Sequence, residues 1–265
     1  MRERVSTLLL VLGTGLNAQD IIVIPGRFDR FTTDELGNVY AVHGDELTLF
    51  DAAGQERARN SIKTFGAIRT MDAFYSLKPV LFSAEQGQLL MLDNTLSVQG
   101  GVIDLSSRGF PQVTLACASV QNAFWLYDQR TPRLVRVDAQ LREIASTGPL
   151  DQLIGFVPRP EEMVELDNWL YVNCPTEGIL VFDLFGTYAR TLPVRGADHF
   201  EVRKQAVYFV DNGTLQRYDM RSFDTTVLPL PVTLAAEPMR NARLEQDHLY
   251  ILLEDRITIC RMPDR

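Results

Sequence analysis

The sequence contains few of the residues from which disulfide frameworks, metal centres and catalytic sites are usually built. Its 265 residues include three cysteines, three histidines and two tryptophans. Cys117, Cys174 and Cys260 are far apart and odd in number, which does not indicate a disulfide framework; one bridge with one free thiol is the alternative. Because no Cys-x-x-Cys motif and no close Cys/His pair occurs, the sequence predicts no metal site and no cofactor.

Motifs of the common enzyme classes are also absent. There is no G-x-S-x-G, no H-E-x-x-H, no phosphate-binding G-x-x-x-x-G-K and no EF-hand loop. His43, His199 and His248 occupy unrelated positions. Adjacent carboxylates in a strand point to opposite faces, so we expect Glu161 and Glu162 to mark a solvated edge. The sequence therefore predicts no catalytic residue and favours a protein that is not an enzyme.

Positive charge is scarce, and only one long apolar run occurs. Lysine and arginine number 26 against 34 aspartates and glutamates, a formal net charge of -8, which disfavours a nucleic-acid partner. Arg2 and Arg4 precede the apolar run from Val5 to Leu16, which is shorter than the about 20 residues that span a bilayer. This order predicts a secretory signal peptide at residues 1–19 rather than an amphipathic or buried N-terminal helix. We expect a periplasmic or secreted protein with no membrane span.

Repeats dominate the rest of the chain. Six units of strand, turn and strand begin at Asn38, Pro79, Ala123, Trp169, Ala206 and His248. An aromatic residue of the first strand recurs every 37 to 46 residues, at Tyr40, Phe82, Trp125, Tyr171, Tyr208 and Tyr250. The second strand ends in aspartate in five units, at Asp51, Asp93, Asp138, Asp183 and Asp219. A period of about 42 residues is typical of one blade of a β-propeller.

Each period has room for four antiparallel strands. In the third unit we expect them at residues 113–120, 123–128, 133–139 and 141–147. The last unit ends after three strands, and residues 20–24 form a strand without a repeat of its own. That strand is predicted to complete the last blade and to protect its edge. The predicted fold is all-β: a six-bladed β-propeller of four-stranded antiparallel blades, in a single domain at residues 20–265.

The alternation of Tyr- or Trp-centred strands with strands that end in aspartate resembles the six-bladed propeller superfamily that includes NHL-repeat and TolB-like proteins. The resemblance covers roughly the whole chain after residue 19. It implies a binding platform, because propellers host many unrelated functions. Lactone hydrolases and some lyases with this architecture hold a metal in the channel, so the resemblance leaves a channel-centred, metal-dependent hydrolase or lyase as the alternative. The metal ligands of those enzymes have no residue-by-residue match here.

The five strand-ending aspartates have a structural interpretation and a functional one. A carboxylate at the end of a strand can accept backbone N–H bonds in the following turn. Identical positions in every blade usually serve the blade itself, so we predict turn-capping aspartates rather than a metal or catalytic ring.

Charged residues are expected on one rim of the propeller. Every connection between blades carries an arginine: Arg27, Arg69, Arg108, Arg159, Arg195 and Arg240. The turns between the two central strands carry acids: Asp45, Glu85, Asp128, Glu177, Asp211 and Glu254. Four of the arginines lie 12 or 13 residues before the aromatic residue of their blade, whereas Arg108 and Arg240 lie 17 and 10 residues before it. Either the two sets neutralise each other, or the arginines converge on the channel mouth and bind an anionic group.

The functional prediction follows from these features together. We expect an exported, non-enzymatic propeller that acts as a protein-interaction or ligand-binding module in the bacterial cell envelope. Its expected partner is an envelope protein or an anionic small ligand.

Overall fold

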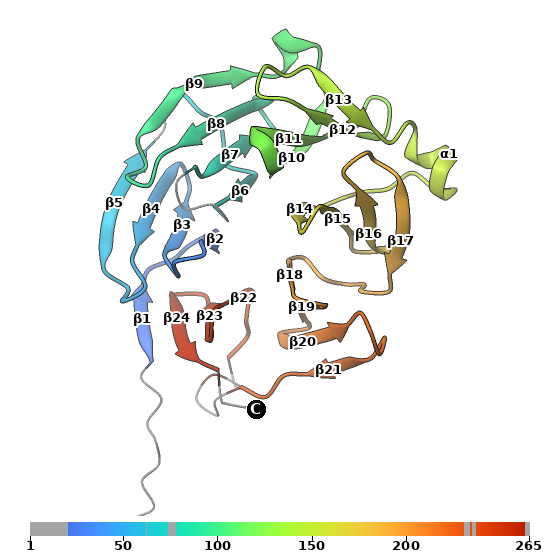
Figure 1. The fold of residues 1–265 in the computed structure, drawn as a ribbon. Helices are drawn as coiled ribbons and strands as arrows, with labels where there is room; N and C mark the ends of the chain where they lie inside the picture. The colour runs from blue at the N-terminus through green and yellow to red at the C-terminus, as the bar shows by residue number, and fades with distance from the viewer. Residues whose placement is uncertain (1–20, 62, 74–77, 231–233, 235–236, 263–265) are drawn as a thin grey trace, which may run out of the picture.

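The computed structural model describes residues 21–61, 63–73, 78–230, 234 and 237–262. The predicted signal peptide at residues 1–19 lies outside them. The described residues form six four-stranded antiparallel sheets, which Figure 1 shows arranged as blades around a central axis. This confirms the predicted six-bladed β-propeller.

The first three blades follow one another along the chain. The first blade consists of β2 (Arg30–Thr33), β3 (Val39–His43), β4 (Glu46–Phe50) and β5 (Glu56–Ser61). The second blade consists of β6 (Thr70–Asp72), β7 (Val80–Ser83), β8 (Gln88–Leu92) and β9 (Val98–Asp104). The third blade consists of β10 (Val113–Ser119), β11 (Ala123–Asp128), β12 (Arg133–Val137) and β13 (Glu143–Ser146). The strands of the third blade lie where the repeat predicted them.

The fourth and fifth blades continue the same order. The fourth blade consists of β14 (Glu162–Leu166), β15 (Trp169–Cys174), β16 (Gly178–Asp183) and β17 (Tyr188–Leu192). The fifth blade consists of β18 (Phe200–Arg203), β19 (Ala206–Asp211), β20 (Thr214–Asp219) and β21 (Thr225–Val227). Short helical segments lie in two connections between blades, at η1 (Ser106–Arg108) and α1 (Leu150–Ile154), and in the turn between β10 and β11, at η2 (Val120–Asn122).

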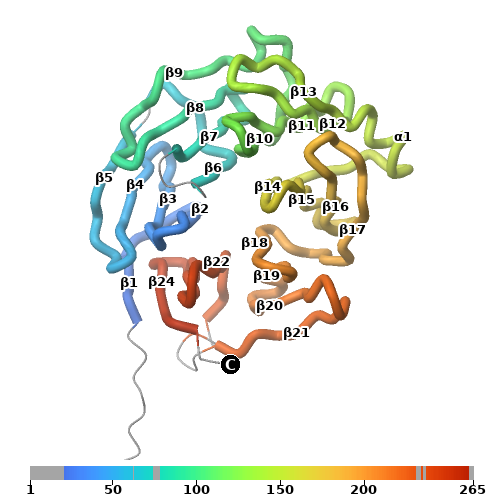
Figure 2. The backbone as a smooth tube through the Cα atoms, in the orientation of Figure 1, coloured from blue at the N-terminus to red at the C-terminus, as the bar shows by residue number. Residues whose placement is uncertain are grey.

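The sixth blade joins the two ends of the described chain. It consists of β22 (Asn241–Glu245), β23 (His248–Leu252), β24 (Arg256–Arg261) and β1 (Ile22–Pro25). Strand β1 pairs with β24 on its outer side, with Ile24 opposite Ile257 (Figure 2). The predicted closure by an N-terminal strand is therefore confirmed.

The hydrophobic core is divided among the interfaces between blades. Six clusters of buried side chains each lie between two neighbouring blades. Trp125 and Tyr40 are 0% and 1% exposed within them, so the repeated aromatic residue of the second strand packs one blade against the next. Cys117, Cys174 and Cys260 are free and buried, which agrees with small apolar side chains in strands.

The strand-ending aspartates cap turns, as predicted. Asp138 Oδ1 accepts hydrogen bonds of 2.9 Å from Gln140 N and Arg142 N. These bonds and the Arg142 guanidinium lower the pKa of Asp138. Asp51, Asp93 and Asp183 accept the equivalent bonds in their own turns. Asp219 accepts bonds from the N–H groups two and three residues after it.

Candidate functional site

The connections between blades and the turns between the second and third strands share one face, here called the crossover face. Gly26 N, in the first connection, donates a hydrogen bond of 2.9 Å to Asp255 O in the turn between β23 and β24. Gly44 N, in the turn between β3 and β4, donates a bond of 2.7 Å to Asp29 Oδ2. The opposite face carries the other hairpin turns and is called the hairpin face.

Most of the predicted rim arginines are exposed on the crossover face. Arg27, Arg108, Arg159 and Arg195 are exposed, and no side-chain hydrogen bond or ion pair links any of them to another described residue. Arg240 donates hydrogen bonds to two backbone carbonyls of the neighbouring blade, Phe28 O at 2.9 Å and Asp29 O at 3.4 Å. Arg69 is half-buried and forms an ion pair with Glu161.

The predicted rim acids do not pair with those arginines within the described part of the chain. Asp128 faces Arg133 of its own hairpin at 3.7 Å, and Asp211 accepts a hydrogen bond from Asn212. Asp45 accepts a bond from Ser61 Oγ at 3.3 Å, and Glu177 Oε2 is buried without a partner among the described residues. Glu85 and Glu254 are exposed.

A central channel of about 340 Å³ runs between the six inner strands, β2, β6, β10, β14, β18 and β22. The strand pairing within each blade shows at which height along the channel each inner-strand residue lies. In each blade one inner-strand residue pairs with the aromatic residue of the second strand. From the first blade to the sixth, these residues are Thr32, Thr70, Cys117, Val164, Glu201 and Arg243. All six line the channel and form one tier, here called the middle tier. Arg30, Glu162 and His199 each lie two positions before a middle-tier residue of their own blade and therefore nearer the crossover face. These three residues form the upper tier.

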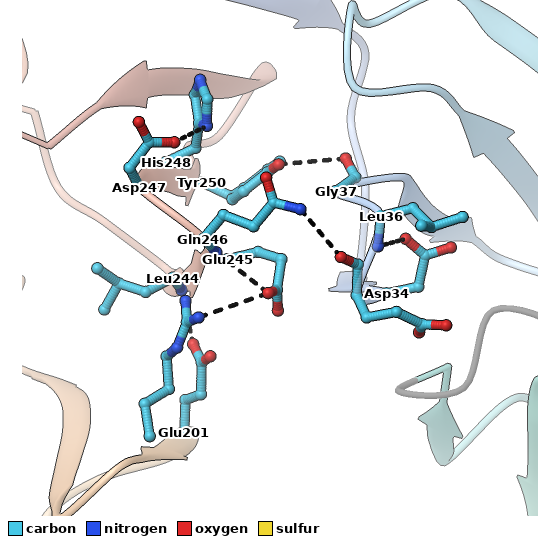
Figure 3. A network of polar contacts seen from close by, with 12 residues as sticks. Asp34, Leu36, Gly37, Glu201, Leu244, Glu245, Gln246, Asp247, His248 and Tyr250 are labelled. Atoms are coloured by element: carbon cyan, nitrogen blue, oxygen red, sulfur yellow. Dashed lines mark hydrogen bonds and ion pairs between the residues drawn. The ribbon is translucent and has the colours of Figure 1, made fainter.

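Carboxylates of the inner strands bind the free backbone N–H groups of the next blade. Glu162 Oε2 accepts a hydrogen bond of 3.1 Å from Phe200 N. Glu201 Oε2 accepts one of 2.6 Å from Leu244 N, and Figure 3 shows these last two residues. Because the inner strand is the edge of its sheet, these N–H groups have no partner strand on the channel side. The carboxylates therefore connect blades and supply the missing acceptors. For Glu162 the predicted solvated edge is wrong.

The charged side chains of the upper and middle tiers, together with the neighbouring Arg69 and Glu161, form a group that we call the channel cluster: Arg30, Arg69, Glu161, Glu162, His199, Glu201 and Arg243. Two ion pairs lie within it. Arg69 pairs with Glu161, and His199 Nδ1 lies 3.5 Å from Glu162 Oε2. Arg30 donates to the backbone carbonyl of Arg69. The cluster therefore combines residues of the first, second, fourth, fifth and sixth blades.

The environment shifts the protonation of the two inner glutamates in opposite directions. Burial by itself raises the pKa of Glu162, but the hydrogen bond and charge of His199 and the charge of Arg243 outweigh it, so this pKa is lowered. Burial also raises the pKa of Glu201, and here the nearby Arg243 and the Leu244 N–H offset it only in part. Glu162 is therefore held as a carboxylate, whereas ionisation of Glu201 is disfavoured.

The two arginines of the cluster that lack a carboxylate partner are Arg30 and Arg243. The Nε atom of each is buried and has no hydrogen-bond acceptor among the residues that the structure describes. Burial and the charge of Arg69 lower the pKa of Arg30, although Asp29 and Glu162 oppose the shift. Both guanidinium groups thus keep hydrogen-bond donors inside the channel.

Toward the hairpin face, a different set of contacts links the blades around the channel. Arg203 lies 3.5 Å from Glu245, and Gln246 Nε2 donates a bond of 3.1 Å to Glu35 O of the first blade. Tyr250 donates to Gly37 O at 3.1 Å, which Figure 3 shows at the junction of the first and sixth blades. These contacts join blades, and because Glu35, Arg203 and Glu245 also line the channel, charged side chains lie toward both of its ends.

Sequence reasoning named one member of the channel cluster as a site residue, Arg69. Arg30 and Arg243 were not singled out, and Glu162 and His199 were set aside. The repeat does mark Glu162 and His199, because each lies nine residues before the aromatic residue of its blade. Glu201 and Arg243 share a position in the same way, because each lies seven residues before the aromatic residue of its blade.

Two further properties bear on the site. Among the described residues, no three His, Cys, Asp or Glu side chains come together in a group that could hold a metal ion. Within the same residues, no helix has the length and apolar character needed to cross a membrane.

Comparisons with known proteins identify the fold. No family model matches the chain, and no curated protein matches its sequence. Virginiamycin B lyase from Staphylococcus aureus is similar in structure, with a TM-score of 0.63 and 11% identity over 92% of this chain and 99% of that one. A catalytically inactive histidine-to-alanine variant of that lyase with quinupristin has a TM-score of 0.59 and 9% identity, over 94% of this chain and 97% of that one.

A propeller of another kind is also similar. The WD40 domain of Neurospora crassa Pan2 has a TM-score of 0.59 and 8% identity, over 91% of this chain and 90% of that one. At such low identity the likeness shows the propeller fold alone, which agrees with the superfamily resemblance seen in the sequence.

Proposed function

We propose that the chain is an exported, non-enzymatic propeller of the bacterial cell envelope that binds a small molecule at the crossover mouth of its channel. The observation that carries the proposal is the channel cluster: charged side chains of five blades gathered between the crossover mouth and the middle tier, with two guanidinium groups incompletely paired. The channel, at about 340 Å³, is within the size range of small-molecule sites.

Thermal unfolding of the purified protein with a panel of anionic, neutral and cationic small molecules tests this proposal. A compound that binds only the folded state raises the unfolding temperature in proportion to the logarithm of its concentration. We expect His199→Ala to weaken that shift and His43→Ala, which changes an exposed histidine at the end of β3, to leave it unchanged. Equal shifts in both variants would place binding outside the channel.

A protein partner on the same face is the other form of the proposal. Arg27, Arg108, Arg159 and Arg195 are exposed there without partners among the described residues, and such arginines can bind an acidic surface. Replacing these four by glutamine should reduce capture of an acidic envelope protein and leave small-molecule binding in the channel unchanged. Unchanged capture by the quadruple variant would remove the rim as a partner site.

Acid–base catalysis is a second candidate function, favoured by the His199–Glu162 pair at the channel mouth. A carboxylate that holds one imidazole nitrogen can leave the other nitrogen to transfer a proton. The similar fold of virginiamycin B lyase suggests quinupristin as a first substrate to test. Conversion of quinupristin by the wild type and not by His199→Ala, followed by mass spectrometry, would favour the enzyme; unchanged quinupristin with both would favour the binding module.

A further inference from the structure

The two arginines of the channel cluster without a carboxylate partner come from adjacent blades and share one electrostatic neighbour, Glu162. Arg30 and Arg243 come from β2 and β22, the inner strands of adjacent blades. Each interacts electrostatically with Glu162 on the opposite strand β14. In the strand register, Arg243 lies in the middle tier and Arg30 in the upper tier, one side-chain step apart along the channel.

Several N–H donors of Arg30 and Arg243 have no acceptor among the described residues. A guanidinium carries five N–H donors. Arg30 donates to one backbone carbonyl, that of Arg69, and no bond from Arg243 to another described residue is found. Since the Nε atoms of both are buried, they have no access to bulk water. A buried donor without an acceptor costs about 1–3 kcal/mol, so an acceptor brought into the channel would be stabilised.

The charges around these donors favour an anion as that acceptor. Arg30, Arg69 and Arg243 carry three positive charges in the cluster. Glu161 and Glu162 oppose them, and each already has a partner, Arg69 or His199. Burial raises the pKa of Glu201, although Arg243 and the Leu244 N–H oppose the shift. The other acids that line the channel, Glu35, Asp72, Asp167 and Glu245, lie outside the channel cluster.

We propose that Arg30 and Arg243 together bind the carboxylate or phosphate group of a small anionic ligand in the upper half of the channel. This inference rests on the proposed function and names its ligand class. Guanidinium groups bind such oxygens in pairs of parallel hydrogen bonds, which gives the site both affinity and orientation. The size of the channel limits the ligand to a small molecule rather than a polymer.

Calorimetry with defined probes tests the ligand class. The probes are inorganic phosphate and malonate as anions, glucose as a neutral compound and choline as a cation, each at low salt because screening weakens such contacts. We expect phosphate or malonate to bind the wild type, and Arg30→Gln and Arg243→Gln each to lower the affinity about tenfold or more. Arg27→Gln removes the same charge from the exposed rim and should change the affinity less than about twofold.

Nuclear magnetic resonance gives a second readout of anion binding that does not depend on the measured affinities. In the ¹H–¹⁵N spectrum of the arginine side chains, two Nε–Hε signals, assigned by their loss in Arg30→Gln and Arg243→Gln, should shift on addition of the anion. If glucose or choline binds in the channel and the anions do not, the anion assignment is wrong while the proposed function stands. If no probe binds and no Nε–Hε signal moves, both are wrong; binding unaffected by either substitution overturns the arginine site.

Discussion

At the scale of single residues, the aspartates that end the third strands of the blades are the clearest repeated device. Each carboxylate accepts backbone N–H bonds from the turn that follows it, as Asp219 does from Arg221 and Ser222. These bonds and the Arg217 guanidinium lower the pKa of Asp219 to about 2. Folding therefore favours the ionised form of these side chains.

The pH dependence of stability follows from that shift. A carboxyl group whose pKa falls from 3.8 to about 2 on folding stabilises the native state above about pH 4, and this stabilisation is lost as the pH falls toward about 2. We expect Asp219→Asn, which keeps an acceptor oxygen without the charge, to flatten this part of the curve of unfolding free energy against pH. Urea unfolding between those pH values measures it. The exposed Asp151→Asn is the control; an Asp219→Asn curve as steep as that of the control would contradict the prediction.

Gly178 is a residue at which backbone conformation and packing both demand glycine. Its φ is +120°, and a Cβ atom there would lie 2.3 Å from Leu192 O. We expect Gly178→Ala to lower the unfolding free energy by about 2 kcal/mol or more, because the β16 start and the facing strand must separate.

Gly87 is the matched control for this substitution. Its φ is +59°, and nothing lies within 4 Å of an added Cβ. Gly87→Ala should therefore cost only the backbone conformation, about 1 kcal/mol. Equal losses for the two variants in urea unfolding would show that the contact with Leu192 is unimportant.

At the scale of elements, the inner strands pose the main physical problem of this fold. Each is an edge strand whose free N–H groups face the channel or the neighbouring blade, and carboxylates of adjacent inner strands bind them. Glu165 of β14 makes the most extensive of these contacts. It accepts hydrogen bonds from Ser119 Oγ at 2.5 Å, Val120 N at 2.9 Å and Trp125 Nε1 at 2.7 Å, all in the third blade.

Removing that carboxylate should weaken the junction of the third and fourth blades. Glu165→Ala leaves three donors without their acceptor, and we expect a loss of about 2–5 kcal/mol in the unfolding free energy measured with urea. Trp125 fluorescence should report the change locally. Glu143→Ala, in an exposed pair with Arg133, serves as the control and should cost less than about 1 kcal/mol. A loss at Glu165 no larger than at Glu143 would refute the connecting role.

At the scale of the whole molecule, the ring is held by six interfaces rather than by one core. Each cluster of apolar residues lies between two blades, so every blade depends on both of its neighbours. Closure depends on β1, whose Ile24 is fully buried between the sixth and first blades. Without this strand, β24 would be an unpaired edge.

Point variants of β1 test the closure without deleting the strand. Ile24→Ala should lower the unfolding free energy by about 2–5 kcal/mol, because it leaves a cavity between two blades. Val23 lies next to it in the same strand but is 48% exposed, and Val23→Ala should cost about 0.5 kcal/mol or less. Thermal unfolding of both variants measures the difference. Equal stability of the two would mean that β1 contributes little to the ring.

Export is a further expectation at this scale. Cleavage after Ala18 or Gln19 predicts a mature protein that begins at Gln19 or Asp20. Mass spectrometry of the protein purified from a Gram-negative host measures its first residue directly. Recovery of the chain with Met1 intact would refute the signal peptide.

The blade pattern could be predicted from the sequence because its determinants are local and repeated. The aromatic residue of the second strand and the aspartate that ends the third act within one blade, so each recurs with the blade period. The strand at the N-terminus could be assigned to the last blade by the same count. Turn capping by Asp51 and its equivalents also needed only the neighbouring residues.

The channel cluster, in contrast, was decided by the tertiary structure. The inner-strand residue paired with the aromatic position lies 7 residues before it in the last three blades, 8 in the first and third, and 12 in the second. Because the intervening hairpins differ in length, distance along the chain does not measure height in the channel. Arg30 and Arg243 therefore interact electrostatically with Glu162 only when six blades close into a ring, since inner strands far apart in sequence then face one another across a single axis.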